Sequence, residues 1–520
     1  MAAILSLREK IGQMLMTGFP GTSLNPEYQR LVEVYKVGNV ILFSHNIENC
    51  TQIQNLNLEL QSLILKNTGI PAYIAVDQEG GMVSRLSSDC TGVPGAMAVS
   101  ATGDSKNARL AGEITARELS TLGINCNLAP VLDINCNPKN PVIGVRSYGD
   151  QKEPVSDFGL QMMQGLHDGG VIPVVKHFPG HGDTSVDSHL SLPAIHKTID
   201  ELEDNELVPF RKAITSGAPC VMTSHILFPA IEKEEVPATM SHTIITGLLK
   251  NKLGFNGLVM TDCMEMNAIR EYFGTAQGAV AAVKAGVHII TISHTPELVE
   301  ASAMAIETAV LSGEIPMRTI DEAVEKILEY KRNIIPIGNP VPDINLVGCE
   351  AHRKAMRRLS QNSITLVSGN IHKQTPLKGK FLFLGSYAYR STLASSAFDK
   401  SFNFPEYMSG KLGGVGITTS LNPTEAEISG ILEIAKGYDC IVMGTYNGHL
   451  NTGQITLGNK LCTVNQRVIV IALRNPYDAG LIKGCALALA TYEYTKSAFD
   501  ALAEVLRGEI PPRGTLPVKL

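Results

Sequence analysis

The sequence has little of what marks nucleic-acid-binding or membrane proteins. Its 520 residues contain no dense tract of lysine and arginine, and 44 basic against 50 acidic residues give a formal charge of −6. Nucleic-acid-binding proteins usually carry a basic patch, so that class is disfavoured. No apolar run approaches the ~20 residues that span a bilayer. The N-terminus lacks the basic stretch of a signal peptide, which favours a cytoplasmic protein, with a processed secreted form as the alternative.

None of the ten cysteines forms a C-x-x-C pair, the spacing expected of a zinc ribbon or a thiol redox motif. Several lie in apolar stretches, as Cys220 does in Ala218-Pro-Cys-Val-Met222. Buried free thiols in a reducing compartment explain this distribution most simply. The cysteines therefore also favour the cytoplasm.

The fold class follows from how apolar segments alternate along the chain. A composition of 44% hydrophobic and 18% charged residues predicts a compact globular protein of two or three domains. Apolar, β-branched runs followed by amphipathic helical stretches predict an N-terminal (β/α)8 TIM-like barrel of the α/β class. An open doubly wound sheet is the alternative, but polar residues gather just after the strands, where a barrel mouth lies. The predicted strands are residues 37–43, 72–76, 125–133, 171–176, 220–224, 258–262 and 288–292.

A proline-rich segment divides the chain. Ile334-Ile-Pro-Ile-Gly-Asn-Pro-Val-Pro-Asp343 holds three prolines and a glycine in ten residues and cannot continue a helix. We therefore predict a barrel domain over residues 1–335, a linker over 336–350, and a smaller C-terminal α/β three-layer sandwich domain over 351–520. Strands in the second domain are predicted at 363–367, 381–384, 440–443 and 468–473.

The densest polar stretch, Lys176–His189, directly follows a predicted strand. It holds three histidines, two aspartates and a lysine in fourteen residues. Unpaired charges are costly to bury, so this cluster indicates a functional site rather than core, and a solvated loop is the simpler alternative. His177 and His181 could ligate a metal, although Pro179-Gly180 would interrupt a helix that aligned them. A metallohydrolase therefore stays open as a second hypothesis.

Further candidates stand at other strand ends. Asp262 ends an apolar strand, as catalytic groups of barrels do, although it could instead cap the next helix. Asp77 and Arg85 flank Gly80-Gly81, which would turn the chain tightly and could bring both side chains to one cavity. The remaining two candidates are Arg146 and His225. A lone histidine such as His225 is more often a core residue with its hydrogen bonds satisfied than a catalytic group.

Three common nucleotide and hydrolase motifs are absent. The chain has no G-x-S-x-G elbow, no Walker-type loop and no strand-linked G-x-G-x-x-G. Carboxylates, cations and imidazoles nevertheless converge on one face from several strand ends. A pocket with many directional polar groups and no evident cofactor site fits a sugar.

These motifs together resemble a known family. Lys176-His-Phe-Pro-Gly-His-Gly-Asp183 with Asp187-Ser-His189 is similar to the signature of bacterial-type β-N-acetylglucosaminidases of glycoside hydrolase family 3. Tyr148 departs from the phenylalanine that is common there. The resemblance covers almost the whole chain, because further segments occur in the family's order. These are Asp77-Gln-Glu-Gly-Gly81, Arg146-Ser-Tyr-Gly149, Met222-Thr-Ser-His225, Thr261-Asp262 and, near the C-terminus, Gly508-Glu-Ile-Pro-Pro-Arg-Gly-Thr-Leu-Pro517.

The resemblance implies a retaining exo-β-N-acetylglucosaminidase that releases terminal N-acetylglucosamine from peptidoglycan- or chitin-derived fragments through a covalent glycosyl-enzyme. It implies Asp262 as the nucleophile, His189 as the general acid/base and Asp187 as the residue that orients His189. It implies no cofactor, no metal, no catalytic residue in the second domain, and a monomer or homodimer without nucleic-acid or membrane partners. The implied substrate-binding residues are Asp77, Arg85, Arg146, Lys176, His177 and His225.

Three alternatives stay open. A histidine acid/base is neutral when deprotonated and would not repel phosphate, so a retaining β-N-acetylglucosaminide phosphorylase is possible chemistry. A β-glucosidase of the same family would lack the Asp-Ser-His arrangement. A sugar-binding protein without catalysis would need neither Asp262 nor the pair Asp187 and His189.

Overall fold

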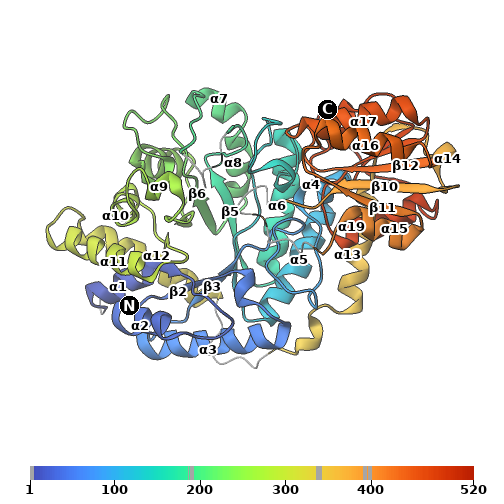
Figure 1. Cartoon of the computed structure of the whole chain (residues 1–520). Helices are drawn as coiled ribbons and strands as arrows, with labels where there is room; N and C mark the ends of the chain where they lie inside the picture. The colour runs from blue at the N-terminus through green and yellow to red at the C-terminus, as the bar shows by residue number, and fades with distance from the viewer. Residues whose placement is uncertain (1–4, 186, 188–191, 335–341, 390–394, 396–400) are drawn as a thin grey trace.

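Two α/β domains make up the structure, a computed structural model in which residues 5–185, 187, 192–334, 342–389, 395 and 401–520 are described. Figure 1 shows the first, coloured blue to yellow, beside the second, coloured orange to red. None of the described helices combines the length and apolar character needed to cross a bilayer.

The first domain is an eight-stranded parallel barrel in the order β7-β6-β5-β4-β3-β2-β1-β8. A bridge between Met260 and Ile289 links the two end strands, so the barrel is nearly closed. This confirms the predicted (β/α)8 barrel and shows that the open-sheet alternative is wrong. The strands are β1 (Leu15–Thr17), β2 (Asn39–Leu42), β3 (Tyr73–Val76), β4 (Cys126–Asn127), β5 (Ile172–Phe178), β6 (Cys220–Thr223), β7 (Leu258–Thr261) and β8 (Ile290–Thr291).

Every residue of the eight barrel strands is buried, as expected when helices cover the outer face and side chains fill the interior. The sequence did not predict β1, because this three-residue strand follows directly on α1 (Leu7–Met14) without a turn signal between them. Tertiary pairing of β1 with β2 and β8 extends the segment.

Helices surround the barrel, and several begin at caps that the sequence specifies. Ser6 and Glu9 form a capping box at α1, and Asn25 and Asn49 accept hydrogen bonds from the first turns of the next two helices. The last barrel helix, α12, packs against α1 and so joins the two ends of the domain. The helices are α2 (Pro26–Tyr35), α3 (Cys50–Thr68), α4 (Ala96–Ala101), α5 (Lys106–Thr121), α6 (Lys152–Asp168), α7 (Ile199–Asp204), α8 (Leu207–Thr215), the π-helix η5 (Thr243–Lys252), α9 (Asn267–Arg270), α10 (Thr275–Ala285), α11 (Pro296–Leu311) and α12 (Met317–Ile334).

The second domain is built on one six-stranded sheet in the order β11-β10-β12-β13-β14-β9, parallel except for β9. Figure 1 shows α16 (Glu425–Ala435) and α17 (Thr452–Val464) on one side of it, and α15 (Phe404–Leu412) and α19 (Lys496–Leu506) on the other. The predicted three-layer sandwich is therefore confirmed, with two strands, β11 and β14, that the sequence did not predict. The strands are β9 (Thr365–Gly369), β10 (Phe381–Ser386), β11 (Val415–Thr419), β12 (Cys440–Thr445), β13 (Val468–Ala472) and β14 (Leu487–Ala490).

Helix α13 (Glu350–Ser363) connects the two domains. It packs against α4 and α5 of the barrel and against α19 of the second domain. The predicted linker, 336–350, falls partly on residues 335–341, which lie outside the described residues. The predicted domain boundaries stay a prediction.

Candidate active site

A cavity of about 770 Å³ opens at the carboxyl ends of the barrel strands, where barrel enzymes place their catalytic residues. Its lining comes from residues within β2, β5, β6 and β8, from the segments that follow β2, β3, β4, β5, β7 and β8, and from the loop that carries Arg146. Six of the predicted catalytic and substrate-binding residues line it together: Asp77, Arg85, Arg146, Lys176, His177 and Asp262.

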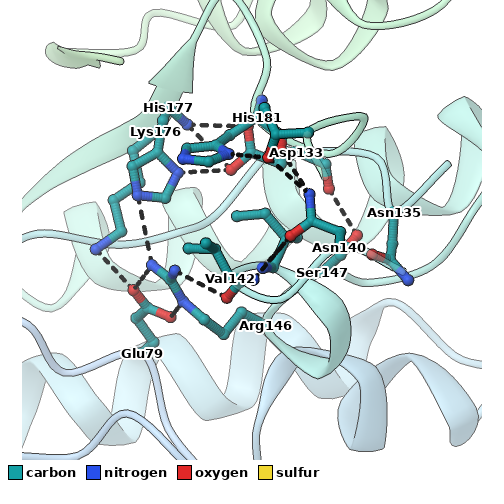
Figure 2. A network of polar contacts seen from close by, with 12 residues as sticks. Glu79, Asp133, Asn135, Asn140, Val142, Arg146, Ser147, Lys176, His177 and His181 are labelled. Atoms are coloured by element: carbon teal, nitrogen blue, oxygen red, sulfur yellow. Dashed lines mark hydrogen bonds and ion pairs between the residues drawn. The ribbon is translucent and has the colours of Figure 1, made fainter. Parts of the chain in front are cut away.

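Three cations and two carboxylates form a connected ion-pair cluster at one side of the cavity. The carboxylate of Glu79 accepts hydrogen bonds from Arg146 at 2.8 and 2.9 Å, and Lys176 Nζ lies 2.7 Å from its Oε1. Figure 2 shows both cations pointing at this carboxylate. Asp77 extends the cluster, since Lys176 Nζ lies 2.8 Å from its Oδ1 and Arg85 lies 3.8 Å from its Oδ2.

Mutual pairing keeps Glu79, Arg146 and Lys176 ionised. Burial alone would raise the pKa of Glu79, but the charges of Arg146 and Lys176 outweigh it and hold that pKa well below its usual range. Burial would likewise lower the pKa values of Arg146 and Lys176, yet the neighbouring carboxylates raise both. The cluster therefore presents fixed, charged donors and acceptors to the cavity.

Asp133 holds His177 and His181 in place. Its Oδ2 lies 2.6 Å from His177 Nδ1, and its Oδ1 accepts the backbone N–H of His181 at 2.7 Å (Figure 2). Since Asp133 is ionised and Arg146 can only donate, His177 carries its proton on Nδ1 and offers Nε2 to Arg146 at 3.4 Å. Burial, together with the neighbouring His177, lowers the pKa of His181 to about 4, so this ring is neutral.

Asp262 follows directly on β7 and faces the cavity from another part of the barrel mouth. Its Oδ1 accepts the backbone N–H of Cys263 at 2.7 Å. The sequence had left open that Asp262 caps the following helix. The structure shows otherwise, because the N-cap of that helix, α9, is Met266. Asp262 thus offers a carboxylate to a ligand bound against the ion-pair cluster.

The remaining predicted residues divide into two groups. Asp187 is described and buried, whereas His189 lies outside the described residues, so their pairing and roles stay predictions. His225 is buried and is not among the described residues that line the cavity; its Nδ1 lies 2.9 Å from Thr239 Oγ1 and its Nε2 3.0 Å from the carbonyl of Cys263. Its contact to sugar stays a prediction, and its position ties β6 to the residue after Asp262.

Several residues of the site escaped the sequence reasoning. Glu79 lies inside the motif Asp77–Gly81, and Asp133 ends a predicted strand. The sequence therefore placed both residues near the site but did not distinguish them from other acidic residues at strand ends. Phe43, whose ring lies 4.8 Å from that of His294, lines the cavity without any motif. Ser395 brings the second domain to the cavity lining, and its sequence position gives no hint of this.

The second domain also packs against the loop that carries Arg146. Asn135 donates to the hydroxyl of Tyr477 at 2.9 Å and accepts from the backbone N–H of Gly144 at 3.2 Å. Gly144 has a φ of +47°, and a Cβ there would lie 2.8 Å from the Asn475 side chain. The loop is therefore held between the barrel and the second domain, two residues before Arg146.

Fold and cavity together define a barrel protein with a deep, charged ligand pocket at its catalytic end. Residues 6–330 match the glycosyl hydrolase family 3 N-terminal domain. The chain belongs to glycosyl hydrolase family 3, in its β-hexosaminidase branch.

Named relatives and a solved structure support this assignment. The chain is 30% identical to β-hexosaminidase A of Pseudoalteromonas piscicida over 96% of its own length and 91% of the relative's. It is 36% identical to a β-hexosaminidase of Alkalilimnicola ehrlichii, over 55% of this chain and 82% of that protein. The structure of a glycoside hydrolase family 3 β-N-acetylglucosaminidase from Paenibacillus sp. str. FPU-7 superposes with a TM-score of 0.90 and 38% identity, covering 99% of both chains.

Proposed function

We propose that this family 3 β-hexosaminidase is a retaining, exo-acting β-N-acetylglucosaminidase. The observation that carries the proposal is that Asp262 lines the same cavity as the cluster of Asp77, Glu79, Arg146 and Lys176. A carboxylate opposite a fixed set of charged donors is what nucleophilic attack on a bound sugar requires.

The ion-pair cluster would bind the terminal, non-reducing sugar. Charged donors and acceptors make stronger hydrogen bonds to hydroxyl groups than neutral ones do. Asp77 is the more accessible carboxylate, since its side chain is 19% exposed against 6% for Glu79. Asp77, Arg146, Lys176 and His177 would therefore contact sugar hydroxyls, while Glu79 and Asp133 hold the cations and the imidazole in position.

The reaction proceeds in two displacements. Asp262 attacks the anomeric carbon as His189 gives its proton to the leaving oxygen, which yields a covalent glycosyl-enzyme and the free aglycone. Water then attacks the same carbon, His189 takes the water proton, and Asp262 leaves as a carboxylate. An imidazole with an unperturbed pKa of ~6.5 can serve in both directions near neutral pH, and Asp187 would orient it.

The substrates we propose are N-acetylglucosaminides derived from peptidoglycan or chitin, met in the cytoplasm. All ten cysteines are free thiols, which is consistent with a reducing compartment.

The decisive experiment is turnover of p-nitrophenyl β-N-acetylglucosaminide with and without phosphate, with the sugar product followed by mass and by NMR of the anomeric proton. Free N-acetylglucosamine, first released as the β-anomer in both conditions, is expected. If sugar 1-phosphate formed, and only when phosphate was present, the enzyme would be a phosphorylase and not a hydrolase. The α-anomer would overturn the retaining mechanism. No turnover would leave the β-glucosidase and sugar-binding alternatives.

His189→Ala tests the acid/base assignment. Loss of the acid should slow substrates with poor leaving groups by about 10²–10⁴-fold, whereas activated aryl glycosides need little protonation and should react much faster by comparison. Equal losses on both substrate types would remove His189 from this role.

A further inference from the structure

A second hollow, of about 670 Å³, lies between α13 and the C-terminal segment 510–513. We call it the cationic groove; it is lined by Glu350, Arg353, Lys354, Arg357, Arg358, Gln361, Asn362, Ile510, Pro511 and Arg513. It shares no described residue with the active-site cavity. Figure 1 shows α13 beside α19, beneath the second domain and next to the barrel.

Positive charge dominates this groove. Five of the ten lining residues are cations, and Glu350 is the single acid among those described. This is the reverse of the whole chain, whose formal charge is −6. Four of the cations occur on α13 as two adjacent pairs one turn apart, and Arg513 comes from the facing segment. Like charges at this spacing repel one another.

Protein contacts hold two of the cations. Arg353 Nε donates to the carbonyl of Gly348 at 2.6 Å. Arg357 is paired with Glu504, which also accepts from Gln361 at 2.6 Å. Glu504 raises the pKa of Arg357 further above its usual value, so this guanidinium is charged at every physiological pH. Fixed guanidinium groups lose little freedom when a ligand binds.

The other three cations are unmatched by the protein. Lys354, Arg358 and Arg513 make no side-chain hydrogen bond or ion pair with any residue in the described part of the chain. All three are exposed. Charges of one sign lining a concave surface focus the potential and draw in counter-ions.

The chemistry of the groove selects the ligand. Guanidinium groups match phosphate oxygens with two parallel hydrogen bonds, and Lys354 adds a point charge. A small anion with a single charge could pair with cations on only one wall of the groove. Linked phosphates could pair with the cations of α13 and with Arg513 on the facing segment at the same time. The hollow has the size of a small-molecule site, and Ile510 and Pro511 supply an apolar wall. We propose that the cationic groove binds a soluble ligand that carries two or more linked phosphates.

The test measures pyrophosphate binding to the full chain. Thermal unfolding is followed by circular dichroism, since the chain has no tryptophan, at ionic strength held constant with sodium chloride. Pyrophosphate should raise the Tm of the wild type, because a ligand that binds only the folded state stabilises it. Titration calorimetry should show that the double variant Arg358→Gln/Arg513→Gln binds about tenfold more weakly or worse.

Two controls make the result specific. Arg318→Gln removes an exposed arginine from α12 of the barrel and should leave the pyrophosphate response intact. Turnover of the aryl glycoside should be unchanged in the double variant, because the groove lies outside the active-site cavity. The proposal is overturned if the double variant responds as the wild type does, or if pyrophosphate adds nothing to matched chloride. Binding to phosphatidylglycerol vesicles without a pyrophosphate response would overturn it in favour of a membrane-facing surface.

Discussion

The active-site cavity and the cationic groove use charge in opposite ways. In the cavity, Arg146 and Lys176 are buried and each forms an ion pair with a carboxylate, so their positions are fixed by the protein. In the groove, Arg358 and Arg513 are exposed and no described carboxylate pairs with them. Buried charge must be balanced within the protein, whereas exposed charge can be left for solvent or a ligand to balance.

The largest expected difference between the two regions is in turnover. Asp262→Ala removes the proposed nucleophile and should lower kcat by ~10⁴-fold, since the proposed glycosyl-enzyme is an ester of its carboxylate. The double groove variant should keep normal kcat. Steady-state kinetics on the aryl glycoside measure both, and an unchanged Tm for Asp262→Ala would show that the loss is chemical. Near-normal activity of this variant would refute the nucleophile assignment.

Stability should separate the regions next. Glu79→Ala leaves Arg146 and Lys176 buried with part of their compensation removed, which should destabilise the fold by about 3–5 kcal/mol. Arg358→Gln alters an exposed side chain and should change the free energy of unfolding by less than ~0.5 kcal/mol. Urea unfolding followed by circular dichroism gives both values. Similar losses in the two variants would contradict the balance of buried charge described above.

A smaller effect should reach the cavity from the second domain. Tyr477→Phe removes the hydroxyl that Asn135 contacts, and so loosens the loop that holds Arg146. Losing one buried hydrogen bond of ~1 kcal/mol should raise KM several-fold with little change in kcat. A matched change at the groove, Asn362→Ala, should leave KM alone. If Tyr477→Phe lowered kcat with KM unchanged, Tyr477 would not position the sugar-binding loop.

The smallest expected effect is that of pH, which acts through the groups that keep the ion-pair cluster charged and hence through the stability of the site. The pKa of Glu79 is held below that of an unfolded glutamate, so its contribution to stability is present above ~4.3 and lost as pH falls through the lower folded value. The pKa of Lys176 is raised, so its contribution is present below ~10.4 and lost as pH rises through the higher folded value. His181, with a pKa of about 4, stays neutral above that.

The charges of Glu79 and Lys176 should therefore not change KM between about pH 5 and 10. The profile of kcat should instead bend near the pKa of the proposed acid/base, ~6.5 before any shift. Initial rates over this range, with substrate varied at each pH, separate the two parameters. A tenfold rise in KM between pH 8 and pH 10 would contradict the raised pKa of Lys176, because this side chain should keep its charge throughout that range.

Much of the barrel could be predicted from the sequence because parallel strands covered on both faces are apolar throughout. The segments around β2, β3, β5, β6 and β7 show this pattern. By contrast, β1 has only three residues and follows directly on α1, so its extended form depends on pairing with β2 and β8. In the second domain, β11 follows directly on a pair of glycines, Gly413-Gly414, which indicate a loop, and its extended form depends on pairing with β10.

The candidate site was predictable where a motif concentrates charge at or just after the end of a strand. Lys176, His177 and Asp262 are such residues, and the structure brings them to one cavity. Asp133 was missed because a single aspartate at a strand end has many explanations. Only its position beneath His177 and His181 shows what it does.

By itself, the sequence determined most of the strands and helices, because hydrophobic periodicity and helix caps act over a few residues. It also determined which polar residues follow which strands. Only the tertiary structure decided which charges pair. It placed Glu79 in ion pairs with both Arg146 and Lys176, and it brought Tyr477 to a loop more than 300 residues earlier in the chain. The reason is physical: ion pairs and hydrogen bonds act over a few ångströms in space, and closing the barrel sets those distances.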